Sequence, residues 1–107
     1  MNKNLVLSFN ETSWELKSLG TESKVVETGG YPIRNELRMY DVYSVSKNGK
    51  NYKKIKVKIS EVNEHLTNVN IYKNDEYLGN TSFNGKNIDL DAMVEITKWV
   101  KFYGENK

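Results

Sequence analysis

The dipeptide Asn48-Gly49 lies between two strand-like segments and constrains the fold more than any other feature of the chain. Asn-Gly favours a two-residue type I′ turn, because both central residues of that turn need a positive φ. The segment from Leu37 to Ile59 is therefore expected to form a β-hairpin about this turn.

A regular hairpin about this turn implies a definite register. It pairs Val45 with Tyr52, Tyr43 with Lys54, Asp41 with Lys56 and Met39 with Lys58. Because side chains alternate between the two faces of a strand, all of these side chains are expected on one outer face. The opposite face then carries an apolar set that is expected to face the core: Tyr40, Val42, Ile55, Val57 and Ile59.

Positive charge is concentrated on the second strand of this hairpin and on its turn. Six lysines and no acidic residue lie between Lys47 and Ile59, although the net charge of the whole chain is only +2. A polyanion would respond to this local charge, because salt screens charges beyond about 8 Å at physiological ionic strength. Lysine and asparagine are abundant throughout, which is also what an AT-rich genome produces, such as that of a low-GC bacterium, its phages or its mobile elements.

Alternating or apolar segments predict strands at 5–9, 14–17 and 24–28 before the hairpin and at 69–72 and 77–83 after it. Glycine-containing segments are expected to interrupt the chain at 20–23 and to form a loop at 29–36. A second tight hairpin is expected about Asn74-Asp75. It would place Ile71 opposite Leu78 and Tyr72 opposite Tyr77.

The C-terminal segment changes to helical spacing. Asp89 or Asp91 is expected to cap the helix, and Gly104 to end it. The sequence thus predicts a single α+β domain over residues 1–107: a meandering antiparallel β-sheet built from hairpins, with one C-terminal α-helix packed on it. The apolar arc of this helix is broad enough to predict a homodimer interface as well, formed by Ile96, Trp99, Val100 and Tyr103.

The residue types give little indication of catalysis. The chain has no cysteine and a single histidine, His65, with no nucleophile motif, metal-ligand spacing or phosphate-binding loop. We therefore expect a non-enzyme with no cofactor, no metal and no small-molecule substrate. The apolar run Leu5–Leu7 is too short for a membrane span, so we expect no membrane association and a cytoplasmic location.

Two functions are compatible with these features. The first is binding of single-stranded nucleic acid, because aromatic side chains stack on bases while cations follow the phosphates. The residues expected to carry it are Tyr43 and Tyr52 with Lys54, Lys56 and Lys58, supported by Lys47, Lys50 and Lys53. The alternative is an inhibitor or adaptor of the kind that phages and mobile elements use, binding a host or defence protein through a tyrosine-rich surface.

Overall fold

The computed structural model describes residues 4–9, 11–63, 65–85 and 88–105. Six strands precede one helix: β1 (Leu5–Phe9), β2 (Thr12–Thr28), β3 (Arg34–Lys47), β4 (Lys50–Asn63), β5 (Leu66–Lys73), β6 (Glu76–Asn84) and α1 (Leu90–Glu105). The strands form one antiparallel sheet in the order of the chain. The expected α+β class, a meandering sheet with a C-terminal helix packed on it, is confirmed.

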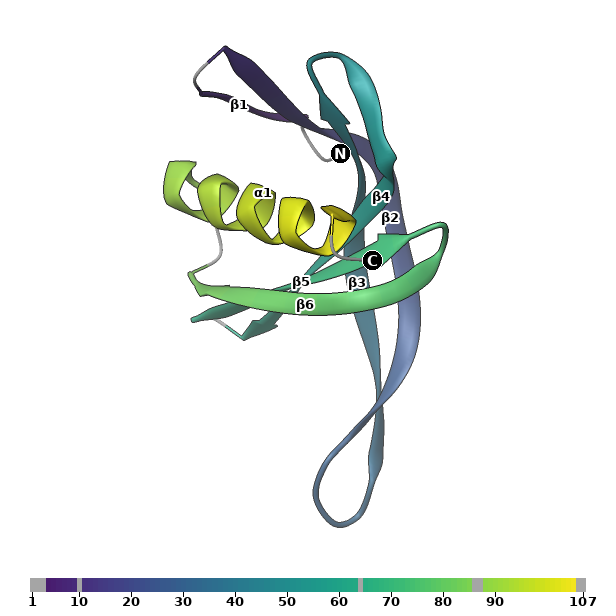
Figure 1. Cartoon of the computed structure of the whole chain (residues 1–107). Helices are drawn as coiled ribbons and strands as arrows, with labels where there is room; N and C mark the ends of the chain where they lie inside the picture. The colour runs from purple at the N-terminus through teal and green to yellow at the C-terminus, as the bar shows by residue number, and fades with distance from the viewer. Residues whose placement is uncertain (1–3, 10, 64, 86–87, 106–107) are drawn as a thin grey trace.

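The sheet curves around α1, which lies in its concave side (Figure 1). The inward face of the helix is fully buried at Ile96 and Val100, and it packs in one cluster with Ile55, Val57 and Ile71 of the sheet. Burying a side chain of this size contributes about 1.5–3 kcal/mol. This cluster accounts for the position of the helix.

The two ends of α1 have different chemistry. The Asp89 carboxylate accepts a hydrogen bond from the Ala92 N–H at 2.9 Å, so Asp89, and not the alternative Asp91, is the N-cap. Gly104 was expected to follow the helix, but it lies in the last turn and is buried. A side chain at Gly104 would approach Tyr52, whose Cε2 is 3.0 Å from the position of a Cβ. The glycine is therefore explained by the close approach of Tyr52.

Strand β2 is longer than predicted, and the expected interruption at 20–23 is wrong. The chain continues as one strand through a β-bulge between Ser18 and Gly20, where Gly20 has a φ of 108°. A bulge adds a residue to one strand and bends it without ending it. Glycine here supplies the positive φ at no steric cost.

The turn at Asn48-Gly49 is confirmed, with φ values of 52° and 82°. It is tied to β2, because Asn48 Oδ1 accepts a hydrogen bond from the Ser13 N–H at 2.8 Å and the Asn48 N–H donates to the Ser13 carbonyl at 2.7 Å. The predicted register holds at the turn itself, where Lys47 pairs with Lys50.

Beyond the turn the predicted register of β3 and β4 is wrong. Tyr43 lies opposite Val57 instead of Lys54, because the register shifts where Lys53 and Lys54 adopt φ values of 48° and 57°. Three extra residues enter β4 here, since the pair Ser46–Asn51 is followed by Ser44–Lys56. An odd shift exchanges the two faces of the strand. The predicted sharing of faces across this hairpin is therefore also wrong.

In the second hairpin, Tyr72 lies opposite Tyr77 as predicted, and their rings make an edge contact at 5.6 Å between centroids. Ile71 lies opposite Gly79 instead of Leu78, because a register shift follows Tyr72. Gly79 lies under the Tyr103 ring of the helix, which occupies the space where a Cβ would be.

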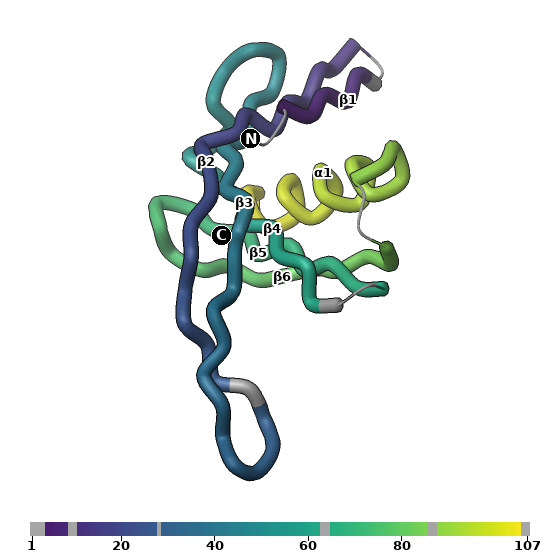
Figure 2. The backbone as a smooth tube through the Cα atoms, turned by 180° about the vertical axis from the view of Figure 1, so that it is seen from behind, coloured from purple at the N-terminus to yellow at the C-terminus, as the bar shows by residue number. Residues whose placement is uncertain are grey.

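Strands β2 and β3 continue past the rest of the sheet as a two-stranded ribbon (Figure 2). We call residues 21–40 the arm. Its strands pair with each other from Thr28–Arg34 to Thr21–Asp41, and β4 joins β3 only from Asp41 onward. The expected loop at 29–36 is shorter than predicted, because β3 begins at Arg34. The arm accounts for the elongated shape, which extends 51 Å along its longest axis.

Candidate functional site

The two tyrosines predicted to stack on bases lie in the core. Tyr43 is 4% exposed and Tyr52 is 8% exposed. Burial is the main cause that raises the pKa of both phenols, and the carboxylates of Asp41 and Glu105 add to it. Tyr52 contacts the Trp14 ring edge-on at 5.0 Å. The prediction of an exposed aromatic face at these two positions is wrong, because the odd register shift turns Tyr43 inward beside Val57.

Lys47 and Lys53 lie beside these buried rings. Lys47 Nζ is 5.4 Å from the centre of the Trp14 ring, and Lys53 Nζ is 5.6 Å from that of Tyr52. Lys53 Nζ also donates to the Gly104 carbonyl at 3.4 Å. The last turn of α1 has no basic residue of its own, so Lys53 supplies the cation that a helix C-terminus favours.

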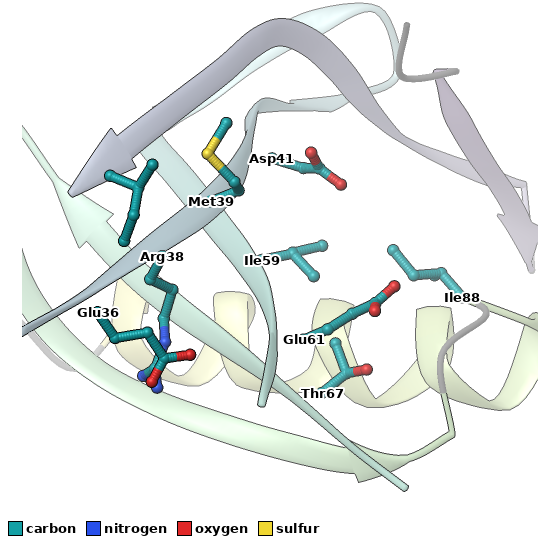
Figure 3. A pocket seen from close by; sticks show the side chains of 9 residues that line it. Glu36, Arg38, Met39, Asp41, Ile59, Glu61, Thr67 and Ile88 are labelled. Carbon is teal, nitrogen blue, oxygen red and sulfur yellow. The ribbon is translucent and has the colours of Figure 1, made fainter. Parts of the chain in front are cut away.

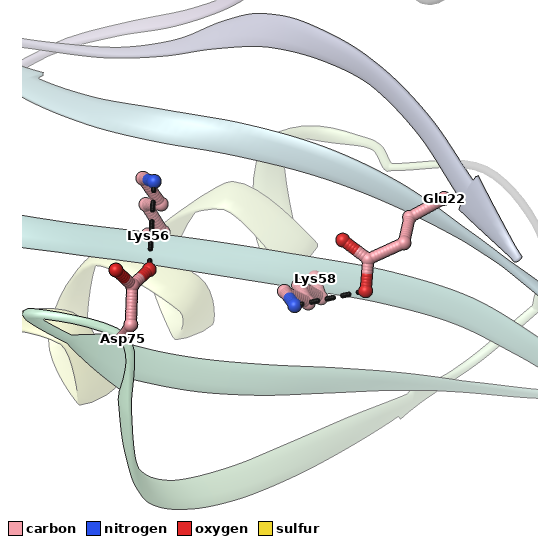
Figure 4. Close-up of polar contacts among 4 residues, drawn as sticks. All are labelled: Glu22, Lys56, Lys58 and Asp75. Atoms are coloured by element: carbon pink, nitrogen blue, oxygen red, sulfur yellow. Dashed lines mark hydrogen bonds and ion pairs between the residues drawn. The ribbon is translucent and has the colours of Figure 1, made fainter. Parts of the chain in front are cut away.

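Lys56 and Lys58 occupy the outer face of β4, where both are in ion pairs (Figure 4). Lys58 Nζ is 3.0 Å from Glu22 Oε1 and 4.7 Å from the centre of the Tyr72 ring. Lys56 Nζ is 3.6 Å from Asp75 Oδ1. Acidic side chains from β2 and from the β5–β6 turn therefore neutralise this part of the lysine row.

The remaining two lysines are exposed near the turn. Lys50 is the first residue of β4, and the Lys54 N–H donates to Asn51 Oδ1 at 2.9 Å within the register shift. The six lysines are therefore distributed over different surroundings. They do not form one cationic face with Tyr43 and Tyr52.

The helix residues predicted to form a dimer interface are mostly used inside the domain. Ile96 and Val100 are fully buried, and Trp99 and Tyr103 are half-buried against the same core cluster. The broad apolar arc is explained by the curvature of the sheet, which surrounds more of the helix than a flat sheet would. Ile96 and Val100 are therefore not available for the predicted interface, whereas the exposed parts of Trp99 and Tyr103 leave their contribution a prediction.

The arm instead presents apolar side chains to solvent. Val25 and Leu37 lie opposite each other, and both are 62% exposed. Met39 follows on the same face, because it is two residues from Leu37 on the strand. This apolar row, made of Val25, Leu37 and Met39, continues the face of β3 that carries the buried Tyr43. The tip adds Tyr31 and Ile33, which are also exposed.

The other face of the arm is charged. Lys24 lies opposite Arg38, and Val26 lies opposite Glu36. The arm therefore has one mostly charged face and one face on which the apolar row lies between the polar side chains of Ser23, Glu27 and Asn35. Here the apolar face continues beyond the part of the sheet that α1 covers (Figure 1).

A cavity of about 400 Å³ lies where the arm diverges from β4, and we call it the fork. Its apolar lining includes Met39, Ile59 and Ile88, and the carboxylates of Asp41 and Glu61 lie beside them (Figure 3). Glu36 and Arg38 also line this cavity, so three carboxylates and one guanidinium lie beside its apolar groups. A lining of this kind would accept a basic or polar side chain more readily than a purely apolar one.

The arm was not predicted, because a loop was expected at 29–36 and an interruption of the chain at 20–23. A signal was present on one strand, where Leu37 and Met39 alternate with Glu36 and Arg38. This alternating segment and the predicted strand at 24–28 are joined by Gly29-Gly30-Tyr31-Pro32, which is typical of a hairpin.

No protein-family model, curated protein or solved structure matches the chain. Within the described residues, no group of three or more histidine, cysteine, aspartate or glutamate side chains is placed to hold a metal ion. Nor is α1 long and apolar enough to cross a membrane.

Proposed function

We propose that the chain is a non-catalytic binding protein and that the apolar row of its arm docks on another protein. The observation that carries this proposal is the exposure of Val25, Leu37 and Met39 on one face of a projecting ribbon. Apolar groups scattered singly over a surface need no explanation, but a contiguous row typically marks an interaction site.

The energetics support docking through this face. An isolated two-stranded ribbon is at best marginally stable in water, and packing one of its faces on a third element stabilises it. Each large aliphatic side chain that becomes buried contributes about 1.5–3 kcal/mol. A partner with a complementary apolar surface would therefore gain affinity and order the arm in the same step.

The inhibitor or adaptor class fits this arrangement better than nucleic-acid binding does. The arm has both an apolar face and an exposed aromatic tip at Tyr31, and aromatic residues are enriched at protein interfaces. The partner we propose is a host or defence protein, in line with the AT-rich composition of the chain. A projecting ribbon of this kind can enter a groove on such a partner and block it.

Nucleic-acid binding stays a prediction, but the exposed face of lysines and tyrosines that suggested it does not form. Its stacking tyrosines are buried, and Lys56 and Lys58 are in ion pairs. Salt-dependent binding of a labelled single-stranded oligonucleotide, weakened by loss of Lys50 and Lys54, would restore that function as the leading one.

The test uses two matched substitutions on the arm. Val25→Thr removes an apolar group from the row, and Val26→Thr makes the same change on the charged face one residue away. The tagged chain is used to recover a stoichiometric partner from nuclease-treated host extract, and its affinity for that purified partner is then measured.

We expect Val25→Thr to weaken binding fivefold to thirtyfold, which corresponds to about 1–2 kcal/mol of lost burial. Adding Leu37→Thr should weaken binding further, whereas Val26→Thr should leave it within about twofold, because a surface substitution away from the contact changes little. Equal effects of Val25→Thr and Val26→Thr, or no nuclease-resistant partner, would contradict the proposal.

A further inference from the structure

The arm has a strand edge with no neighbouring strand in the described part of the chain. Between Arg34 and Tyr40, β3 pairs with β2 on one side, and its pairing with β4 on the other side begins only at Asp41. Such an edge presents backbone N–H and C=O groups that can pair with a further strand.

The sequence along this edge is complementary to itself. Its midpoint is Leu37, so antiparallel pairing of two identical edges about the midpoint places Leu37 opposite Leu37. The same register places Glu36 opposite Arg38 of the second copy, and Arg38 opposite Glu36 of the second copy. Opposite charges at directly facing positions stabilise a strand pair, whereas like charges destabilise it.

We propose that two copies of this chain associate through this edge of β3 and form a four-stranded arm with two-fold symmetry. Each copy uses the same surface, as a two-fold interface requires. Neither Glu36 nor Arg38 is in an ion pair within the described residues, and both lie along the wall of the fork (Figure 3). The two charges are therefore placed to pair with a second copy.

The other edge of the arm offers a weaker match. Antiparallel pairing of β2 about Ser23 places Glu22 opposite Lys24 of the second copy. Glu22 is already engaged with Lys58 at 3.0 Å, whereas Glu36 and Arg38 have no such ion pair within the described residues. The free charges therefore favour the β3 edge for association.

In the same register, the tip of each arm lies against the second copy. This register brings Ile33 of each copy level with Asp41 of the other, at the mouth of the fork. Tyr31 and Ile33 are exposed in the single chain, and the fork contains the apolar side chains of Ile59 and Ile88. Each tip would thus cover the fork of the other copy, which adds apolar burial to the backbone pairing.

This association differs from the docking proposed above and does not depend on it. Facing residues in a strand pair share a face, so the apolar rows of the two copies join into one continuous surface. In the four-stranded arm, Val25 and Leu37 of one copy continue into Leu37 and Val25 of the other. The dimer leaves this surface open to a different protein.

A charge swap tests the register. Glu36→Arg places like charges opposite Arg38, and Arg38→Glu places them opposite Glu36, whereas the double variant restores both pairs. Sedimentation at several protein concentrations gives the dimer dissociation constant. We expect each single variant to raise it tenfold or more and the double variant to return it to within about threefold of the original. Glu27→Arg, the same substitution on the β2 side of the arm, is the control and should leave it within about twofold.

A cysteine variant gives a second, independent measurement. The chain has no cysteine, so Leu37→Cys introduces a single thiol. Facing Cα atoms in an antiparallel pair lie about 4.5–5.5 Å apart, which is within the range of a disulfide. Mild oxidation should therefore cross-link this variant within the dimer. Val25→Cys should not cross-link, because three strand spacings of about 4.8 Å separate the two copies of that residue.

The outcomes separate this proposal from the proposed function. A chain that is monomeric at every concentration, single charge variants that leave the dimer unchanged, or a double variant that stays monomeric would overturn the dimer. So would cross-linking of Val25→Cys without Leu37→Cys. If Glu36→Arg abolishes the dimer and partner binding persists, the dimer is supported and the docking proposal is unaffected.

Discussion

Tyr52→Phe is expected to stabilise the protein, although it alters a buried residue. The Tyr52 ring is 8% exposed and packs against Trp14, and its hydroxyl is buried with no hydrogen-bond partner among the described residues. The unfolded chain hydrates this hydroxyl, so folding loses its hydrogen bonds to water. A buried unsatisfied group of this kind costs about 1–3 kcal/mol.

Phenylalanine keeps the ring and removes the cost. The lost oxygen leaves a small space beside Gly104, whose Cβ position is 3.4 Å from the hydroxyl, and this offsets part of the gain. We therefore expect the free energy of unfolding to rise by about 1 kcal/mol and the Tm to rise by about 4–8 °C. Urea and thermal unfolding measure both quantities. Tyr77→Phe, at an exposed tyrosine, is the control and should change stability by less than about 0.5 kcal/mol.

A loss of 1 kcal/mol or more in Tyr52→Phe would refute this reasoning, because it would mean that the hydroxyl makes a favourable interaction in the folded state. Alkaline pH gives a further check. The pKa of Tyr52 is raised by burial and by Glu105. Its ionisation therefore takes no stability from the fold below the ordinary tyrosine pKa of 10.0, and stability is lost as the pH rises above that value through the folded-state pKa. The variant should lose less stability than the original chain above pH 10.0, with the remaining loss including that of Tyr43, whose pKa is also raised.

Two further substitutions test how α1 is held. Gly79→Ala places a Cβ in the space of the Tyr103 ring, and such overpacking should destabilise the protein by about 1–3 kcal/mol in urea unfolding. Gly29→Ala, whose Cβ meets open space, is the control. Equal effects of the two substitutions would contradict the packing argument. Asp89→Ala removes the N-cap acceptor and should lower the free energy of unfolding by about 1 kcal/mol. Asp91→Ala removes only a charge in the first turn and should lower it less. The reverse order would show that the capping hydrogen bond contributes little.

Features that depend on local chemistry were predicted correctly from the sequence. The turn at Asn48-Gly49, the cap at Asp89 and the pair Tyr72–Tyr77 each follow from a few adjacent residues. In each case the side chain or backbone preference is satisfied within the element itself. Tertiary packing did not have to be known.

The order of the strands was predicted, but the register between β3 and β4, which depends on the whole sheet, was not. The register of β3 and β4 is set by the core, which requires Tyr43 and Val45 to share a face with Ile55 and Val57. An ideal hairpin about Asn48-Gly49 separates these sets, and only an odd number of inserted residues brings them together. Lys53 and Lys54 supply the insertion at the cost of two positive φ values, which is unusual for lysine and which no local rule predicts.

The same shift explains why the charge pattern was misleading as evidence for a binding site. Six lysines in one segment suggest one surface only if the strand is regular. The insertion includes Lys53, which lies beside the Tyr52 ring, and Lys47 lies beside the Trp14 ring of the neighbouring strand. Lysine density in sequence therefore reports a polyanion site only after the register is known.

On the arm, by contrast, a proposed interaction surface lies in a segment without excess charge. Its net charge is zero, so composition gave no reason to consider it, yet it carries both arginines of the chain. Arginine presents a planar set of donors that pairs well with a carboxylate, which suits a strand edge where Arg38 must face a glutamate at a fixed spacing. If the dimer forms as proposed, Arg38→Lys should weaken it while Lys24→Arg on β2 should not, and this difference can be measured in the same sedimentation experiment. No effect of Arg38→Lys, or an equal loss in Lys24→Arg, would contradict pairing of the Arg38 guanidinium with Glu36 across the edge.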